Sequence, residues 1–425
     1  MDLLRRRMSN YSFARYFQWT KQIGLIGFAQ FSVQLISFAC GILIIRLLSP
    51  DQYALYTIAN MMLGSMAIIG DSGIGAGAMS QGGKVWQQRK KLGEIMVTAL
   101  YLRKRFFLVT ICVAVPILIY LLHLHGSSWW GMLIIVLAVI PAFLASVTDT
   151  LYEVPAKLNQ DIAALQKNSM SVSVLRLCLI LATLFFFPFA ALAILTAGIS
   201  RIWGNRKLFK VSVKYADLKA YLNPHVKTEI IRIVKRVLPG AIYFCLSSQI
   251  SIWLISIMGK TRDIAHIGAL SRLGTAFGLF TAVSYTFVLP RFARLPEHRN
   301  VLLKRFIQIQ GILFLLSVVI MAVASAFSNQ LLWILGPEYS GLSFELKLSV
   351  AGSCLALFIG TNIGLSQSRG WILHPLISIP VTACAIITGA FILDVSMLRG
   401  ALKFNIYVGL IEILMYYIYC FIKMK

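Results

Sequence analysis

Acidic side chains are scarce in this sequence, and the common catalytic motifs are missing from it. The 425 residues include 15 Asp and Glu against 40 Lys and Arg, and no predicted outer connection contains an acidic metal-binding pair. A Gly-x-x-x-x-Gly-Lys-Ser/Thr loop is also absent, so ATP hydrolysis by this chain is not indicated. The seven cysteines show no metal-ligand spacing, and we interpret them as packing residues. These absences argue against an enzyme and predict no metal and no cofactor.

Long apolar stretches are abundant instead. Hydrophobic residues make up 58% of the chain, and a helix needs about 20 apolar residues to cross a hydrocarbon layer of about 30 Å. The sequence therefore predicts an all-α membrane protein with about 12 transmembrane helices. The predicted spans are residues 23–48, 54–78, 106–122, 130–148, 171–187, 189–203, 238–258, 264–289, 306–327, 346–365, 375–393 and 401–422.

The fifth and sixth spans depend on a tight turn at residues 185–188, which read Phe-Phe-Phe-Pro. Proline interrupts a helix because it lacks a backbone donor and its ring clashes with the preceding turn. We predict a hairpin of two short helices here. A single long kinked helix is the alternative, and it would invert the topology of everything downstream.

Lys and Arg are distributed unevenly between the connecting segments. With the N-terminus inside, the even-numbered connections and both tails hold 31 of the 40 basic residues. Inner loops of membrane proteins keep this excess because Lys and Arg translocate poorly. The sequence pI of about 10.0 then reflects topology, so we do not expect nucleic acid as a partner.

The spans divide into two sets of six, separated by a longer connection. This connection alternates Ile and Val with Lys and Arg, a pattern typical of an amphipathic helix on the inner membrane surface. Both sets begin on the inner side, as expected of a parallel duplication. We predict a cytoplasmic segment at 1–22, a first lobe at 23–204, a linker at 205–237, a second lobe at 238–422 and a tail at 423–425.

Charged residues within the spans are the candidate functional residues, because lipid makes them costly. The spans and their edges contain five basic and two acidic residues, namely Arg46, Arg176, Arg201, Arg272, Lys347, Asp71 and Glu412. Their positive surplus favours an anionic cargo, since arginine offers a planar fork that matches phosphate oxygens. Arg201 and Lys347 lie near span ends, where they are expected to reach the membrane interface.

Two groups of site residues follow from position and helical face. For cargo binding we predict Arg272, Arg176, Arg46, Asn60 and Gln34, although Arg46 projects about 160° away from the polar stripe of the first span and could mark the outer rim. For ion coupling we predict Glu412 and Asp71, because a desolvated carboxyl takes up a proton more readily. A structural ion pair is the alternative role for Glu412, and simple contact with water is the alternative for Asp71.

Three segments carry a resemblance to a known family. Residues 46–56 (RLLSPDQYALY) resemble the first outer turn of polysaccharide exporters in the multidrug/oligosaccharidyl-lipid/polysaccharide (MOP) superfamily. Residues 289–295 (LPRFARL) and 335–339 (LGPEY) are similar to the family's end of the eighth helix and its outer turn after the ninth. The family usually has Gly where this chain has Ala54. The O-antigen flippases are the branch it resembles most.

The resemblance implies two six-helix lobes around a central cavity that opens alternately to each side, as in MATE transporters. Its expected cargo is an oligosaccharide linked to undecaprenyl pyrophosphate, moved from the inner to the outer leaflet of the bacterial plasma membrane for lipopolysaccharide assembly. Arginines in the cavity would then bind the pyrophosphate, and a glycan polymerase and ligase would be partners. The alternatives are a membrane scaffold for these assembly proteins and a MATE-type exporter of small molecules.

Overall fold

The chain is described here by a computed structural model, which covers residues 27–248, 250–274, 288, 289, 292, 295, 298–369, 371 and 373–424. All regular structure in these residues is helical, as predicted. The first helix is described over Gly27–Leu47. The elements that follow are α2 (Pro50–Asp71), α3 (Ile74–Gly83), α4 (Arg89–Leu124), α5 (Trp129–Leu158), α6 (Ile162–Leu184), α7 (Ala190–Tyr215), α8 (Pro224–Ser248), α9 (Ile250–Met258), α10 (Thr261–Gly274), α13 (Arg299–Ala326), α14 (Ser328–Leu335), the short 3-10 helix η2 (Pro337–Tyr339), α15 (Ser343–Ser368), α16 (Pro375–Ile392) and α17 (Leu398–Lys423).

Membrane-spanning length is reached by most of these helices. Within the described residues, nine helices are long and apolar enough to cross a bilayer, and α8 with α9, bent by 56°, would form a tenth. The predicted sixth span corresponds to α7, which packs along α5 and α6. The predicted eighth span begins in α10, and its second half lies outside the described residues, as do the N-terminal segment 1–22 and most of the LPRFARL segment. The protein is therefore an all-α, multi-pass membrane protein.

The turn at residues 185–188 separates two helices that pack against each other, α6 and α7. The backbone amide of Phe187 still donates to the carbonyl of Thr183 at 2.9 Å, and the chain reverses before Ala190 begins α7. The hairpin prediction is thus confirmed over the single kinked helix.

The second predicted span, 54–78, is not one continuous helix. It breaks between α2 and α3, where Ser72 and Gly73 both adopt left-handed backbone angles, with φ of 41° and 86°. Gly73 suits this position because left-handed angles cost it little. A Cβ atom at Gly73 would also lie 2.9 Å from Cβ of Val237 on α8. The break therefore fits the surface of α8.

Two helices extend farther than their apolar cores predict. The third span was placed at 106–122, but α4 begins at Arg89, so the basic run 103–105 lies inside the helix. The predicted linker 205–237 is also largely helical, because α7 continues to Tyr215 and α8 runs unbroken from Pro224 into the seventh span. The first half of α8 has an apolar face, because Ile230 and Val234 are buried against α3 and α4. The location of this amphipathic helix on the inner membrane surface stays a prediction.

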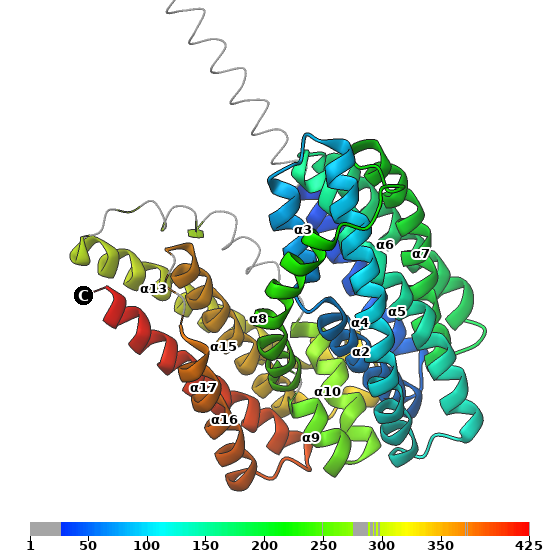
Figure 1. Cartoon of the computed structure of the whole chain (residues 1–425). Helices are drawn as coiled ribbons and strands as arrows, with labels where there is room; N and C mark the ends of the chain where they lie inside the picture. The colour runs from blue at the N-terminus through cyan, green and yellow to red at the C-terminus, as the bar shows by residue number, and fades with distance from the viewer. Residues whose placement is uncertain are drawn as a thin grey trace, which may run out of the picture.

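The helices form two lobes that meet mainly at one end. We call the first helix to α7 the N-lobe and α9 to α17 the C-lobe, and we use "outer" and "inner" for the two ends according to the predicted topology. At the outer end α2 packs against α10, whereas α13 and the C-terminal end of α17 lie apart from α3 at the inner end (Figure 1). The lobes therefore close on the outer side and diverge toward the inner side.

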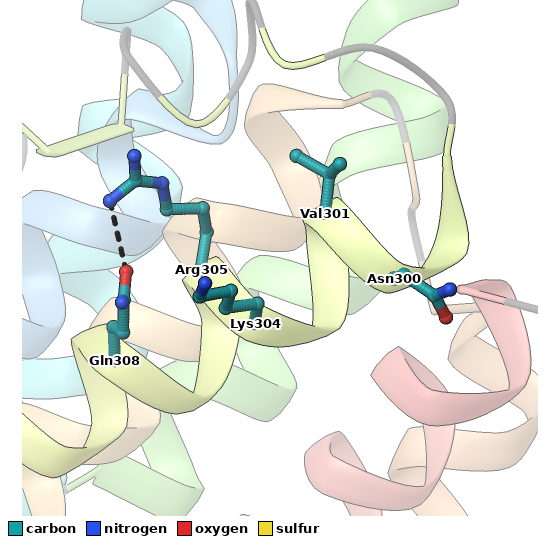
Figure 2. Close-up of a pocket in the computed structure, with 5 residues that line it drawn as sticks. All are labelled: Asn300, Val301, Lys304, Arg305 and Gln308. Carbon is teal, nitrogen blue, oxygen red and sulfur yellow. Dashed lines mark hydrogen bonds between the residues drawn. The ribbon is translucent and has the colours of Figure 1, made fainter.

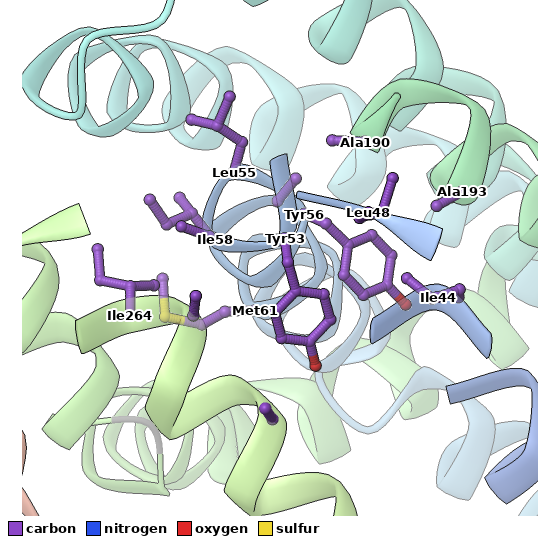
Figure 3. Close-up of a cluster of buried hydrophobic side chains, with 14 of the residues drawn as sticks. Ile44, Leu48, Tyr53, Leu55, Tyr56, Ile58, Met61, Ala190, Ala193 and Ile264 are labelled. Atoms are coloured by element: carbon purple, nitrogen blue, oxygen red, sulfur yellow. The ribbon is translucent and has the colours of Figure 1, made fainter. Parts of the chain in front are cut away.

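The outer seam between the lobes is tightly packed. Tyr53, Tyr56 and Met61 of α2 are buried near Ile264 of α10 (Figure 3). Gly268 of α10 approaches α2 so closely that a Cβ atom there would lie 2.4 Å from Oγ1 of Thr57. Only a glycine allows this separation of the two helices.

Candidate functional site

Arg272 crosses from one lobe to the other. Its α10 backbone belongs to the C-lobe, and its Nη2 donates to the phenol oxygen of Tyr56 on α2 at 3.2 Å. The guanidinium carbon also lies 5.8 Å from the centre of the Tyr56 ring. On the other side, Cδ of Arg272 is 3.4 Å from where a Cβ atom of Gly41 would be. Gly41 of the first helix thus leaves room for the arginine side chain.

Arg176 approaches the same part of the first helix from the N-lobe. It lies on α6, about 12 Å from the outer end of that helix at 1.5 Å per residue. Its side chain is half-buried and electrostatically coupled to Cys40, the neighbour of Gly41. Its Nε is buried and has no hydrogen-bond partner among the described residues. Arg272 therefore contacts the first helix at Gly41, and Arg176 lies within electrostatic range of the adjacent Cys40.

The predicted amide side chains lie on the open surfaces of two N-lobe helices. Asn60 and Gly64 are exposed on α2, although most of that helix is buried. Gln34 is half-buried on the first helix. Within the described part of the chain, neither amide side chain forms a hydrogen bond with another residue. The role of both amides in cargo binding stays a prediction.

Arg46 lies away from this group, at the outer rim. Its Nε donates to the carbonyl oxygen of Ile334 at 2.8 Å, and its Nη2 donates to that of Trp333. The guanidinium also stacks over the Trp333 ring, 4.7 Å from its centre. All of these contacts join the N-lobe to the C-lobe, so Arg46 is already engaged with protein atoms in this conformation.

Asp71 is held in an ion pair at the break between α2 and α3. It binds the guanidinium of Arg103, whose side chain is only 5% exposed, and it accepts the backbone N–H of Gly75 at 3.1 Å. Arg103 also donates to the carbonyl oxygen of Val147 on α5 at 2.9 Å. Because burying an arginine requires a partner, the position of Asp71 fits a structural role. Its assignment to ion coupling stays a prediction.

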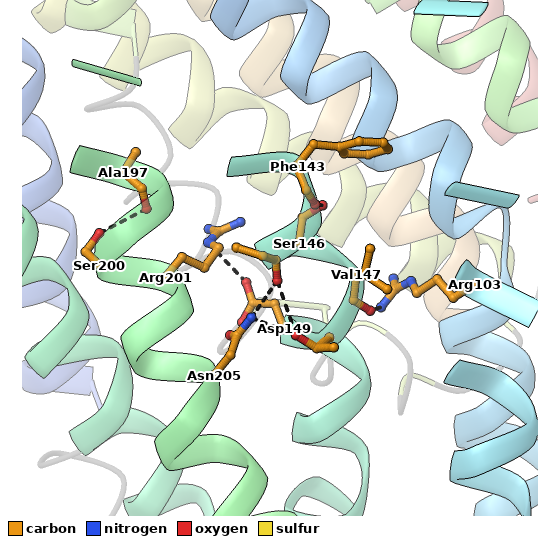
Figure 4. Close-up of polar contacts among 11 residues, drawn as sticks. Arg103, Phe143, Ser146, Val147, Asp149, Ala197, Ser200, Arg201 and Asn205 are labelled. Carbon is orange, nitrogen blue, oxygen red and sulfur yellow. Dashed lines mark hydrogen bonds and ion pairs between the residues drawn. The ribbon is translucent and has the colours of Figure 1, made fainter. Parts of the chain in front are cut away.

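A second, more exposed ion pair lies beside the first, between α5 and α7 (Figure 4). Nε of Arg201 is 3.2 Å from a carboxylate oxygen of Asp149. Asn205, one turn along α7, donates to Oγ1 of Thr148 at 2.8 Å. Asp149 and Arg103 are not among the predicted site residues, because both lie just outside the predicted spans 130–148 and 106–122. Their opposite signs near the ends of these spans are the available signal.

Glu412 stands apart from these ion pairs. It is half-buried near the middle of α17 and forms no ion pair or hydrogen bond with any described residue. Tyr243 of α8 and Tyr416 of α17 lie within electrostatic range of its carboxylate. No cation of the described residues lies within ion-pair distance of its carboxylate, whereas Asp71 is paired with Arg103.

Two open hollows lie at the inner ends of the lobes. One, of about 360 Å³, is lined by exposed residues at the start of α13, where Nη1 of Arg305 donates to Oε1 of Gln308 at 2.9 Å (Figure 2). The other, of about 460 Å³, lies between the ends of α3 and α5 beside Trp86. Neither is lined by Arg272 or Arg176.

Comparison with known proteins places this fold. No protein-family model matches the chain, and no curated protein matches it in sequence. Among solved structures, the lipid II flippase MurJ in an inward closed conformation matches with a TM-score of 0.74 and 15% identity over 94% of this chain and 89% of that chain. An inward-facing multidrug resistance MATE family transporter of the MOP superfamily matches with a TM-score of 0.69 and 14% identity over 92% of this chain and 93% of that chain.

A third match bears on the conformation. An outward-facing multidrug resistance MATE family transporter of the MOP superfamily gives a TM-score of 0.60 at 14% identity, over 94% of this chain and 93% of that chain. The chain thus has the fold of MOP superfamily transporters. It matches the two inward states better than this outward one, in agreement with the packed outer seam.

Proposed function

We propose that this protein is a flippase of the bacterial plasma membrane. Its cargo is an oligosaccharide linked to undecaprenyl pyrophosphate, of the O-antigen repeat type, which it moves from the inner to the outer leaflet by alternating access. The observation that carries this proposal is the approach of Arg272 and Arg176, from opposite lobes, to Gly41 and Cys40 of the first helix.

The charges at membrane depth support an anionic cargo. Two intramembrane arginines, Arg103 and Arg201, are paired with carboxylates. Arg272 donates to the phenol oxygen of Tyr56, and Nε of Arg176 has no acceptor among the described residues. Guanidinium groups bind phosphate oxygens through paired hydrogen bonds, so a pyrophosphate would supply an acceptor for Arg176 and would add to the contacts of Arg272.

The polar and apolar surfaces fit the other two parts of such a cargo. The exposed amides of Asn60 and Gln34 can donate to and accept from sugar hydroxyls. The polyprenyl chain of the cargo is apolar and would remain in the surrounding lipid. The protein therefore needs no cavity that encloses this chain. MurJ, which shares this fold, is named as a lipid II flippase.

For energy coupling, Glu412 is the better candidate of the two carboxylates. Its carboxylate is not neutralised by any described residue, whereas that of Asp71 is paired with Arg103. We propose that Glu412 takes up and releases a proton during the transport cycle.

Reconstitution tests the proposed function directly. Purified protein in liposomes should move a fluorescent lipid-linked oligosaccharide to the opposite leaflet, where a membrane-impermeant quencher detects it. Arg272→Ala and Arg176→Ala should abolish this movement while protein abundance stays unchanged, and Arg262→Ala, an exposed outer arginine, is the matched control. Normal lipid translocation by both Arg272→Ala and Arg176→Ala would refute the cargo-binding roles assigned to these two arginines.

The same assay separates the alternatives. A scaffold for the polymerase and ligase would move no lipid when reconstituted alone. A small-molecule exporter, which the likeness to MATE structures keeps open, would instead transport cationic dyes and ignore the lipid-linked oligosaccharide.

A further inference from the structure

Two N-lobe side chains contact the C-lobe through backbone carbonyl groups at the outer end. Arg46, in the last turn of the first helix, donates to the carbonyl oxygens of Ile334 and Trp333. His125, which follows α4, places Nε2 2.6 Å from the carbonyl oxygen of Ser256. Neither contact involves a carboxylate.

The accepting carbonyl groups share a position in their helices. Trp333 and Ile334 belong to the last turn of α14, and Ser256 belongs to the last turn of α9. The last four carbonyl groups of a helix have no intrahelical donor, and they carry the negative end of the helix dipole. An arginine placed there gains both hydrogen bonds and a favourable electrostatic interaction.

The aromatic ring of Trp333 adds a second hold on Arg46. The guanidinium carbon lies 4.7 Å from the ring centre, within the range of a cation–π interaction. The ring itself is 70% exposed, so this contact lies at the surface of the protein. Arg46 is therefore held by the ring of Trp333 and by the backbone carbonyl oxygens of Trp333 and Ile334.

We propose that Arg46 and His125 form an outer latch that holds the inward-facing conformation and is broken in each transport cycle. Both residues reach across the boundary between the lobes, so the lobes cannot separate on the outer side while these bonds persist. This assigns Arg46 to control of conformation and removes it from the predicted cargo-binding group. The inference does not depend on the identity of the cargo.

The chemistry of the latch suits repeated opening. Breaking a buried ion pair would leave an uncompensated charge in a low-dielectric interior, which is strongly unfavourable. Here the released carbonyl groups and the Arg46 side chain lie at the outer boundary, where water can replace the lost hydrogen bonds. The latch thus stabilises the closed outer side without making opening prohibitive.

Distance measurements between spin labels test this inference without cargo. Genetically encoded p-acetylphenylalanine replaces Phe187, in the N-lobe turn after α6, and Ser340, in the C-lobe after η2. Labels attached at these exposed sites report the separation of the lobes at the outer end by pulsed electron resonance, and they leave the native cysteines unlabelled.

Removal of the latch should shift the distance distribution. Arg46→Ala should raise the ratio of outer-open to outer-closed molecules by about tenfold, since two charge-assisted hydrogen bonds and a cation–π contact are lost. Trp333→Ala should produce a smaller increase, because the backbone oxygens remain. Arg262→Ala is the matched control: its exposed ion pair with Glu338, at 3.4 Å, lies within the C-lobe, and its distribution should match that of the unsubstituted protein.

Two outcomes would overturn the proposal. One is an unchanged distribution in Arg46→Ala, and the other is an equal shift in the Arg262→Ala control. Arg46→Lys provides a second test if the alanine variant does not fold. Lysine keeps the positive charge but lacks the planar guanidinium that donates to two carbonyl oxygens. This variant should therefore still raise the outer-open fraction. The distance between the spin labels does not depend on lipid translocation. The latch can therefore be confirmed or refuted even if the proposed cargo is wrong.

Discussion

The glycine at the outer seam gives the sharpest test of how the lobes close. In Gly268→Ala, the new Cβ atom would lie 2.4 Å from Oγ1 and 2.8 Å from Cγ2 of Thr57 on α2, whereas ordinary contacts begin near 3.4 Å. Thr57 cannot easily turn away, because its hydroxyl donates to the carbonyl oxygen of Tyr53 at 2.8 Å and its χ1 angle is stiff. The helices must therefore separate by about 1 Å.

The energetic cost falls on only one conformation. Overpacking of this kind costs about 1–3 kcal/mol, and it applies only while α2 and α10 are in contact. The gain in helix propensity from Gly to Ala, about 1 kcal/mol, applies to both conformations and cancels. We expect the outer-open population to rise about 5- to 150-fold relative to the closed one.

Spin labels at Phe187 and Ser340 measure this shift. The second substitution Thr57→Ala should restore most of the closed population in Gly268→Ala, because it removes both clashing atoms. Gly311→Ala is the control, since a Cβ atom there would have no neighbour within 4 Å. A distribution in Gly268→Ala that equals that of the control would refute the reasoning about the seam.

Three further predictions concern the N-lobe ion pair, the lone carboxylate and the helix break. Arg103→Ala should lower the free energy of unfolding by about 3–5 kcal/mol, seen as a lower melting temperature in detergent, because Asp71 loses its partner; an unchanged melting temperature would contradict this. Glu412→Gln should still bind cargo but lose the pH dependence of translocation in liposomes, and an unaltered pH profile would remove the proton-coupling role. Gly73→Ala should reduce thermal stability, since its φ of 86° and the Val237 side chain 2.9 Å away both oppose a Cβ atom; equal stability of this variant and Gly311→Ala would argue against strain at the break.

Much of the fold could be predicted because lipid imposes a simple rule on the sequence. The helices had to be long and apolar, and Pro188 marked the hairpin between α6 and α7. The break at Gly73 was also marked, since Ser72 and Gly73 are typical turn residues, but the apolar residues on both sides obscured it. The extent of α4 and α8 could not be read from hydrophobicity, because both helices continue into charged sequence.

The site was less accessible to sequence reasoning. The predictions placed Arg272 and Arg176 in different lobes, and the structure shows both side chains at the first helix. Arg103 was assigned to an inner loop because it stands in a run of three basic residues. Its burial depends on Asp71, 32 residues earlier in the chain. The partners of Arg46 are backbone oxygens, which any residue could supply, so no sequence signal marks them.

The course of α8 gives the middle of the chain a mechanical role. Its first half is fixed to the N-lobe through Ile230 and Val234, and it continues past Tyr243 into α9, which packs on α10 and α17. The pair α8 and α9, which is bent by 56°, thus belongs to both halves of the protein, and any rocking of the lobes must change its shape. Pro239 lies inside α8 and has no backbone N–H to donate to the preceding turn of the helix. Bending of α8 at this residue therefore breaks no hydrogen bond from its own nitrogen. The two lobes are therefore joined by helices and not by a loose loop.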